Sequence, residues 1–428
     1  MPVRATTTWS PGVSEIKLDP YLQAYAHRMR GATASEIRAL FSVASRPEVV
    51  SLAGGMAYTA ALDFDAVAEV TQEVLRRDGP TALQYGGGQG MPELRERLVE
   101  VMAVEGGAAH PDDLVVTTGG QQALDLIAKL FCDPGDVVLA EGPTYVGALS
   151  ALSTYQPQVI HLPMDEEGLI PEALAQALEY LAANGRRAKF LYTVPNHQNP
   201  AGVSLSPKRR EQIVDLALTH NLLVVEDNPY GLLDFKGEVR TPLAALAPEQ
   251  VIYVGTLSKI LSPGLRVGWI AASPPIRDKL ILLKEAADLS QSNLTQHIAE
   301  RWFATQPWLE QIEAFREVYR ERCDAMLEAL ATDFPPGCTW SVPTGGFFVW
   351  LRLPPGLNSG ELLAQALNAR VAYVPGRAFY ADDSGSDAMR LSFCYPTPEQ
   401  IRAGVARLAE VVREEIELVR AVYGDREP

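Results

Sequence analysis

The stretch VIYVGTLSKILSPGLRVGW, residues 251–269, joins an apolar run to a lysine and an arginine. The run VIYV has the β-branched and aromatic composition of a buried strand, and small and hydroxyl residues follow it. Lys259 comes at the end of that strand, and the quoted stretch contains no acidic residue to pair with it. A lysine removed from water loses basicity and becomes a nucleophilic amine that can form a Schiff base. The stretch therefore predicts a strand that ends at a reactive lysine.

Five more apolar segments of this kind occur along the chain: DLVVTTGG (113–120), DVVLAEGPTY (136–145), AKFLYTVPN (188–196), LLVVEDNPY (222–230) and GWIAAS (268–273). Segments with helical periodicity lie between them, such as QQALDLIAKLF and SPKRREQIVDLALTHN, the second opening with Ser206 as a predicted N-cap. Alternating strands and helices predict an α/β fold with a mostly parallel sheet covered on both faces. Such sheets bind ligands at the carboxyl ends of their strands.

The pattern of predicted helices and strands changes after about residue 300. Long helical patterns appear there, followed by the strand-like TGGFFVWLRLP and a charged amphipathic stretch near the end. This change predicts a second, smaller α+β domain. We predict three parts: an N-terminal segment, 1–50, that packs on the small domain and the substrate site; a large domain, 51–300; and a small domain, 301–428.

Composition excludes several classes of protein. The chain has 428 residues, of which 47% are hydrophobic, and a formal net charge of −16, which argues against binding nucleic acid. It has no apolar run long enough to span a membrane, and its start lacks the apolar centre of a secretion signal, so we expect a cytoplasmic location. The four cysteines are scattered without C-x-x-C spacing, so neither a metal site nor a disulfide framework is predicted.

Glycines between a strand and a helix suggest an anion site. Gly119, Gly120 and Gln121 occupy such a junction, where backbone N–H groups and the helix dipole can hold a phosphate, although small residues also occur there for packing. The chain has no G-x-x-x-x-G-K-[ST] motif, and GGGQGM at 86–91 lacks the third glycine of the dinucleotide fingerprint. The first absence argues against a nucleoside-triphosphate site, and the second argues against the dinucleotide site of a Rossmann dehydrogenase.

Other strand ends carry polar residues. Asp227 ends a strongly apolar strand. A carboxylate buried there needs a cation or hydrogen-bond donors as partners. The alternative is that Asp227 is an ordinary loop aspartate or a helix N-cap. Asn199 precedes a proline and can either form a turn or bind a ligand. Arg266 offers a permanently charged guanidinium that can bind phosphate. With Lys259 and Tyr230, they form the set that pyridoxal 5'-phosphate needs: partners for its aldehyde, ring nitrogen and phosphate.

The sequence also resembles a known family, the fold type I pyridoxal-phosphate enzymes of the aspartate aminotransferase superfamily, class I/II. The likeness is greatest to 2-aminoadipate, kynurenine and aromatic aminotransferases. It rests on motifs along nearly the whole chain: SEIRALF, SLAGGM, LQYGGGQGMPELR, TTGGQQALDL, EGPTY, QNPAG, EDNPYG, LSKILSPGLRVGW, GGFFVW, VPGRAFY and MRLSF. It implies a large domain with a mostly parallel, seven-stranded type of sheet between helices, and a smaller α+β domain.

The resemblance implies a role for each matching residue. Lys259 would carry the cofactor as a Schiff base and later move a proton at the substrate, and Asp227 would keep the cofactor ring nitrogen protonated. Asn199 and Tyr230 would bond the phenolic oxygen, and Tyr145 would stack on the ring. The remaining cofactor contacts would be Gly119, Gly120, Gln121, Thr256, Ser258, Arg266 and, from the partner subunit of a homodimer, Tyr85. Substrate contacts would be Arg390 at the α-carboxylate, Arg38 at a distal carboxylate, Asn199 and Gly55.

The implied activity is transfer of the α-amino group of an amino acid to a 2-oxo acid, 2-oxoglutarate being the expected acceptor, by a ping-pong mechanism through Lys259. Two alternatives stay open: another pyridoxal-phosphate reaction, such as decarboxylation or elimination, and a non-catalytic sensor. Sensors of this kind carry a basic winged-helix domain ahead of the core, for which residues 1–50 are too short. Three positions depart from the family pattern: Thr256 replaces serine, NPAG replaces NPTG, and GGMA at 54–57 replaces GGLP. The last change leaves substrate specificity open.

Overall fold

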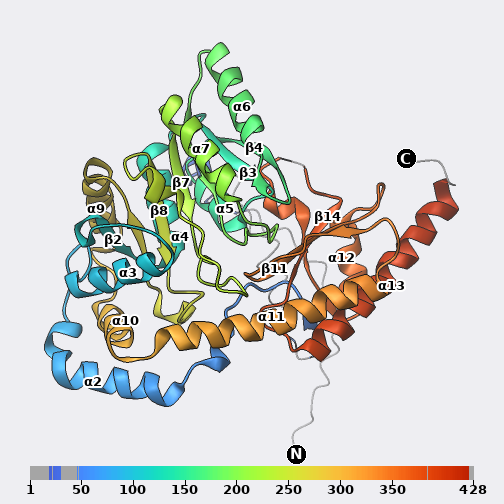
Figure 1. Cartoon of the computed structure of the whole chain (residues 1–428). Coiled ribbons are helices and arrows are strands. Elements are labelled where there is room, and N and C mark those ends of the chain that lie inside the picture. The colour runs from blue at the N-terminus through green and yellow to red at the C-terminus, as the bar shows by residue number, and fades with distance from the viewer. Residues whose placement is uncertain (1–18, 22, 30–45, 47, 383, 424–428) are drawn as a thin grey trace, which may run out of the picture. The chain divides into compact units, whose positions relative to one another are not determined.

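The computed structural model describes residues 19–21, 23–29, 46, 48–382 and 384–423 and divides into two compact units, Met1–Ala34 and Ser35–Pro428. In the first unit, the side chain of Asp19 accepts a hydrogen bond from the Tyr21 N–H at 2.9 Å, and a short 3-10 turn, η1, spans His27–Met29. All further described elements belong to the second unit (Figure 1). The SEIRALF motif at 35–41, which contains the predicted substrate contact Arg38, lies outside the described residues.

The larger sheet has the strand order β2-β9-β8-β7-β6-β3-β4-β5. Its strands are β2 (Leu114–Thr117), β9 (Gly268–Ala271), β8 (Val251–Thr256), β7 (Leu223–Asp227), β6 (Ala188–Thr193), β3 (Val137–Gly142), β4 (Gln158–Asp165) and β5 (Gly168–Leu169). All six predicted strands are present. Strand β4, whose apolar residues are interrupted by His161 and Pro163, was not predicted from the sequence. Neither was the two-residue β5, which extends the expected seven-stranded sheet.

Strand direction in this sheet brings distant residues to one edge. Strands β4, β3, β6, β7 and β8 pair in parallel, whereas β9 is antiparallel to both of its neighbours, β8 and β2. The carboxyl ends of the parallel strands therefore meet the amino end of β9. Asp227 is the last residue of β7, Lys259 follows β8, and Arg266 precedes β9, so all three reach the same edge.

Both faces of the sheet are buried. Along β3, Val138 and Ala140 belong to one core cluster, and Val137 and Leu139 belong to another. The first cluster includes α4 (Gly119–Phe131) and α5 (Val146–Ser153), and the second includes α6 (Pro171–Ala183), α7 (Pro207–Thr219) and α8 (Leu243–Leu246). Ser206 caps α7, as predicted, by accepting a hydrogen bond from the Arg209 N–H. The near-continuous apolar runs in β2, β3, β8 and β9 reflect this two-sided burial.

Four more helices belong to this part of the chain: α2 (Phe64–Ala82), α3 (Pro92–Val104), α9 (Pro274–Asp288) and α10 (Asn293–Thr305). Helix α10 packs on α2 and α3, and α9 packs on α4. Short 3-10 turns occur at η2 (Thr59–Ala61), η3 (Pro111–Asp113), η4 (Pro263–Leu265) and η5 (Gly376–Phe379). None of the helices within the described ranges is long and apolar enough to cross a membrane.

The C-terminal third contains a second, antiparallel sheet with the order β10-β11-β14-β13. Its strands are β10 (Thr339–Trp340), β11 (Phe348–Arg352), β14 (Ala388–Ser392) and β13 (Val374–Pro375), and its helices are α11 (Trp308–Asp333), α12 (Ser359–Asn368) and α13 (Pro398–Tyr423). Helices α11 and α13 lie side by side (Figure 1, orange and red). Strand β1 (Val50–Ser51) pairs in parallel with β12 (Val371–Ala372), which joins residue 50 to this region. The domain limits near residues 50 and 300 stay predictions.

Candidate active site

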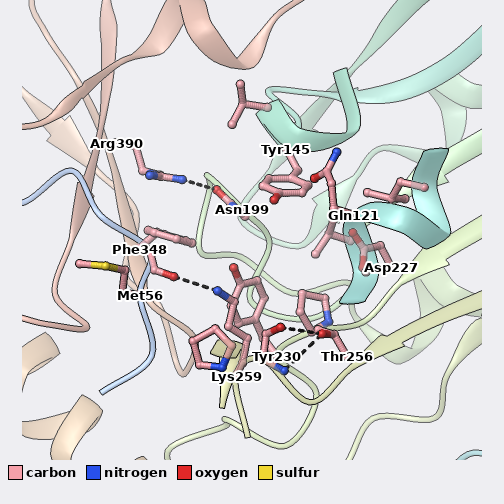
Figure 2. A pocket seen from close by; sticks show the side chains of 18 of the residues that line it. Met56, Gln121, Tyr145, Asn199, Asp227, Tyr230, Thr256, Lys259, Phe348 and Arg390 are labelled. Carbon is pink, nitrogen blue, oxygen red and sulfur yellow. Dashed lines mark hydrogen bonds between the residues drawn. The ribbon is translucent and has the colours of Figure 1, made fainter. Parts of the chain in front are cut away.

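A cavity of about 330 Å³ opens at the edge where the strand ends meet, within the ~300–1,000 Å³ usual for small-molecule sites. The lining residues are Gly55, Met56, Gly120, Gln121, Leu124, Tyr145, Val146, Val194, Asn199, Asp227, Pro229, Tyr230, Thr256, Ser258, Lys259, Pro263, Arg266, Phe348 and Arg390. Figure 2 shows Arg390 and Asn199 on one side and Gln121, Asp227 and Thr256 on the other. Twelve of these positions were predicted as site residues from the sequence. Gly119 and Tyr85 do not line the cavity, and Arg38 lies outside the described residues.

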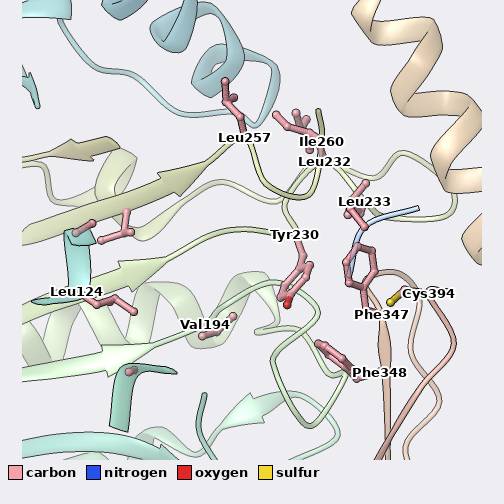
Figure 3. Packing of buried hydrophobic residues seen from close by; sticks show 14 of the residues in the cluster. Leu124, Val194, Tyr230, Leu232, Leu233, Leu257, Ile260, Phe347, Phe348 and Cys394 are labelled. Atoms are coloured by element: carbon pink, nitrogen blue, oxygen red, sulfur yellow. The ribbon is translucent and has the colours of Figure 1, made fainter. Parts of the chain in front are cut away.

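Lys259 projects into the cavity from apolar surroundings. Its Nζ donates a hydrogen bond to the Gly55 carbonyl at 2.8 Å and lies 5.5 Å from the centre of the Phe347 ring. Figure 3 shows the packing of Tyr230, Phe347 and Phe348 in this region. Burial lowers the pKa of Lys259 to about 8, because the charged form loses its hydration. The amine is therefore much more nucleophilic at neutral pH than an ordinary lysine.

This shift predicts a pH dependence for attachment of an aldehyde to the cofactor-free chain. Only the neutral amine attacks, so the second-order rate with pyridoxal 5'-phosphate should rise with pH and level off above the Lys259 pKa of about 8. At pH 7.5 roughly a quarter of the amine would be neutral, against ~0.1% for an unperturbed lysine. Stopped-flow absorbance between pH 6 and 10 measures the profile. A rate that still rises in proportion to hydroxide at pH 10 would contradict the lowered pKa.

Asp227 is a buried residue of the cavity lining. Burial raises its pKa to about 6, and a hydrogen bond from the Tyr192 hydroxyl to Oδ2, at 2.7 Å, opposes this effect by stabilising the carboxylate. Tyr192 was not predicted as a site residue. Residues 190–193 of its strand, β6, are buried in succession, so the sequence marks Tyr192 only as core. The Asp227 carboxylate is suited to pair with a cationic ring nitrogen. Such a cation would further favour the charged form of the carboxylate.

The N-terminus of α4 forms an anion site with Arg266. Gly119 has a φ of +74°, and a Cβ added to it would lie 2.5 Å from Arg266 Nη2, so glycine lets the guanidinium approach. Arg266 Nη2 donates to the Thr118 carbonyl at 3.2 Å. The first-turn N–H groups of a helix have no partner within the helix and attract anions. Gly119 thus shapes the anion site without lining the cavity.

Hydroxyl groups complete this end of the cavity. Thr256 Oγ1 donates to Ser258 Oγ at 2.9 Å and accepts from the Ser258 N–H at 3.2 Å. Threonine therefore supplies the hydroxyl that serine supplies in the family pattern, and the departure at this position leaves the anion site intact.

Arg390 faces the cavity from β14. Its Nη1 donates to Asn199 Oδ1 at 2.9 Å and its Nη2 donates to the Ala53 carbonyl at 2.6 Å. The guanidinium lies 4.1 Å from the centre of the Phe348 ring, and its buried Nε has no hydrogen-bond partner among the described residues. Burial lowers the pKa of Arg390 to about 10, so the side chain stays cationic at neutral pH. It can bind a carboxylate through two nitrogens.

Two tyrosines supply hydroxyl groups. Burial raises the pKa of both Tyr145 and Tyr230, so both phenols stay protonated and can donate hydrogen bonds. Tyr230 packs edge-on against Phe347 and Phe348, with ring centres 5.3 and 6.1 Å away. Seven apolar lining residues were not predicted as site residues from the sequence: Met56, Leu124, Val146, Val194, Pro229, Pro263 and Phe348. Of these, Phe348 lies in the GGFFVW motif, which was noted without a role.

These groups meet the requirements of one cofactor. The cavity offers an amine of lowered pKa, a buried carboxylate, hydroxyl donors and an anion cradle whose glycine admits Arg266. On an α/β fold with these strand ends, they define a site for pyridoxal 5'-phosphate.

Comparison with known proteins agrees with this class. The pattern of the family described as aminotransferase class I and II matches residues 47–408, and the chain belongs to that family. It is 41% identical to aromatic-amino-acid aminotransferase 1 of Thermococcus litoralis over 92% of this chain and 95% of that one. It is 38% identical to 2-aminoadipate transaminase of Thermus thermophilus over 90% and 96% of the two chains. A structure of Pyrococcus horikoshii kynurenine aminotransferase in complex with PMP superposes with a TM-score of 0.89, at 39% identity, covering 92% of this chain and 98% of that one. The protein is a pyridoxal-phosphate-dependent aminotransferase of fold type I.

Proposed function

We propose that this aminotransferase transfers the α-amino group of an amino acid to 2-oxoglutarate in two half-reactions that share one cavity. The observation that carries the proposal is the meeting of Lys259, Asp227 and Arg390 around that cavity. A nucleophilic amine, a partner for a ring nitrogen and a carboxylate clamp are the groups that transamination requires. The names of the similar proteins make aromatic amino acids, 2-aminoadipate and kynurenine the first donors to test.

The cofactor would be held at its aldehyde carbon, ring nitrogen, ring face, phenolic oxygen and phosphate. Lys259 would bond its aldehyde carbon, Asp227 would pair with its ring nitrogen, and Tyr145 would stack on its ring. The phenolic oxygen would accept from Tyr230 and from the amide nitrogen of Asn199, whose Oδ1 already accepts from Arg390. Phosphate contacts would come from Gly120, Gln121, Thr256, Ser258 and Arg266, with Gly119 shaping the cradle. When bound, the cofactor supplies an electron sink for the carbanion that forms at the substrate α-carbon.

The chain itself provides binding, orientation and proton transfer. Arg390 would fix the substrate α-carboxylate, and Phe348 and Asn199 would hold the guanidinium in place. The lowered pKa of about 8 gives the Lys259 amine a substantial neutral fraction near neutral pH, and this neutral form could take the proton from the substrate α-carbon. Apolar packing around the cavity excludes water and so protects the carbanion from unproductive protonation.

Single-turnover spectroscopy tests the proposal. Phenylalanine added to the holoenzyme should convert the cofactor to its amine form without a second substrate, and 2-oxoglutarate should then restore the aldehyde form. Complete recovery over repeated cycles supports two separate half-reactions. Release of carbon dioxide or ammonia in place of a 2-oxo acid would favour a decarboxylase or a lyase.

Arg38 stays a predicted contact for a distal substrate carboxylate. The cationic residues that line the described cavity, Lys259, Arg266 and Arg390, each have another proposed partner. We expect Arg38→Ala to lower kcat/KM for 2-aminoadipate by about a hundredfold, because a buried charge would lose its partner. The value for phenylalanine should change by less than about fivefold. Steady-state kinetics with both donors measure this, and equal losses would assign Arg38 a structural role.

We further propose a homodimer in which Tyr85 reaches the partner subunit's phosphate site. Its side chain is 80% exposed in this chain and does not line the chain's own cavity. The predicted cytoplasmic location stays a prediction.

A further inference from the structure

An ion pair with a buried lysine lies behind the anion site, outside the cavity. Lys284 is fully buried in α9, and its Nζ donates to Asp288 Oδ1 at 2.6 Å. The other carboxylate oxygen of Asp288, Oδ2, accepts from Thr118 Oγ1 at 3.0 Å and from Gln122 Nε2 at 2.7 Å. One carboxylate therefore ties α9 to the first turn of α4.

These bonds determine how α4 begins. Thr118 is the residue before the helix, and its side chain makes no capping bond. Its hydroxyl instead points to α9 and donates to Asp288. Gln122 accepts from the Thr118 N–H at 2.7 Å and so stands in for a cap. The Thr118 and Gln122 side chains are both hydrogen-bonded to Asp288. The backbone N–H groups of Gly120 and Gln121, in the first turn of the helix, are therefore available to bind a ligand.

The same segment also holds Arg266. Gln291, three residues beyond Asp288, donates through Nε2 to the Arg266 carbonyl at 3.1 Å. Arg266 has a positive φ of 54°, a conformation that side-chain-bearing residues rarely adopt and that outside contacts must maintain. Residues 284–291 thus hold both halves of the anion site, although none of them lines the cavity.

The complete burial of Lys284 distinguishes this pair from an ordinary surface ion pair, and the Asp288 side chain is 28% exposed. On the same helix, Arg277 pairs with Asp278 at 2.8 Å, but the Asp278 side chain is 65% exposed. A buried lysine cannot move into solvent without breaking its ion pair, so the contact with Asp288 defines the position of the Lys284 amine. The pair is neutral overall and adds no net charge behind the anion site.

We propose that the Lys284–Asp288 pair is a positioning device for the cofactor phosphate, setting the start of α4 against Arg266. The proposal rests on the proposed phosphate site. A positioning role makes a specific demand: loss of the pair must weaken binding of the phosphate group more than binding of the ring. A pair that merely stabilises the fold would affect cofactor analogues with and without phosphate alike.

The test uses the double variant Lys284→Met/Asp288→Ala in the full-length chain. Removing both charges keeps the local net charge unchanged and leaves no unpaired buried lysine. After removal of cofactor, the chain is titrated with pyridoxal 5'-phosphate and with pyridoxal, which lacks the phosphate, and fluorescence quenching gives each Kd. We expect the Kd for pyridoxal 5'-phosphate to rise at least about tenfold, and that for pyridoxal to change by less than about twofold. Equal changes for the two compounds, or no change for either, would overturn the proposal.

Three further variants make the result interpretable. Asp278→Ala, an exposed aspartate on the same helix, should leave both Kd values unchanged. Arg266→Ala should lose the preference for pyridoxal 5'-phosphate over pyridoxal. If this variant keeps the preference, the proposed phosphate site itself is wrong. If only the double variant fails to change the preference, the positioning role alone is overturned. If the double variant does not fold by circular dichroism, Thr118→Val removes one bond to Asp288 and should lower phosphate preference by about threefold or more. An unchanged preference in Thr118→Val would then count against the proposal.

Discussion

Replacing Lys259 by alanine is expected to lower turnover by at least about three orders of magnitude while the chain still folds and holds cofactor without a covalent bond. The variant loses both the nucleophile and the base that would act at the substrate α-carbon. The fold should persist, because the Lys259 side chain makes one hydrogen bond, to the Gly55 carbonyl, and faces the cavity.

Single-turnover kinetics with saturating cofactor measure this loss, and the absorbance of the bound cofactor reports whether the covalent bond to the chain is absent. Lys189→Ala is the matched control, because this lysine is 40% exposed and pairs with Asp136 on the surface. It should keep wild-type activity. A Lys259→Ala variant within tenfold of the wild type would remove Lys259 from the mechanism.

Replacing Asp227 by alanine is expected to lower turnover by about two to three orders of magnitude, even at saturating cofactor. The ring nitrogen would lose the carboxylate that keeps it protonated, so the cofactor would stabilise the substrate carbanion poorly. The Tyr192 hydroxyl would also lose the acceptor it contacts at 2.7 Å. The Kd for the cofactor should rise as well, because a buried ion pair loses one partner.

The measurements are kcat at several cofactor concentrations and the cofactor Kd. Asp215→Ala, at an exposed position of α7, is the control and should match the wild type. An independent readout is nitrogen-15 NMR of labelled cofactor in the wild-type holoenzyme. An unprotonated ring nitrogen there would mean that Asp227 has a different role.

The sequence by itself determined which residues end the strands. Strand and helix patterns are local, so apolar runs and turn residues located six strands of the large sheet. A polar residue at the end of a strand buried on both faces stands out, and Asp227 and Lys259 were recognised in this way. Because parallel strands place their carboxyl ends at one edge, the sequence also predicted that these residues would meet.

Only the tertiary structure decided the contacts between residues far apart in the chain. The reversed direction of β9 brings Arg266 to the α4 N-terminus, and no local pattern encodes that direction. Arg390 and Asn199 are 191 positions apart, and Gln122 and Asp288 are 166 apart, yet each pair shares a hydrogen bond. In the sequence, Tyr192 and Phe348 look like core residues, because each stands in an apolar strand segment and such a segment indicates only burial. Their partners, Asp227 and Arg390, depend on how strands and sheets pack, which is a property of the whole chain.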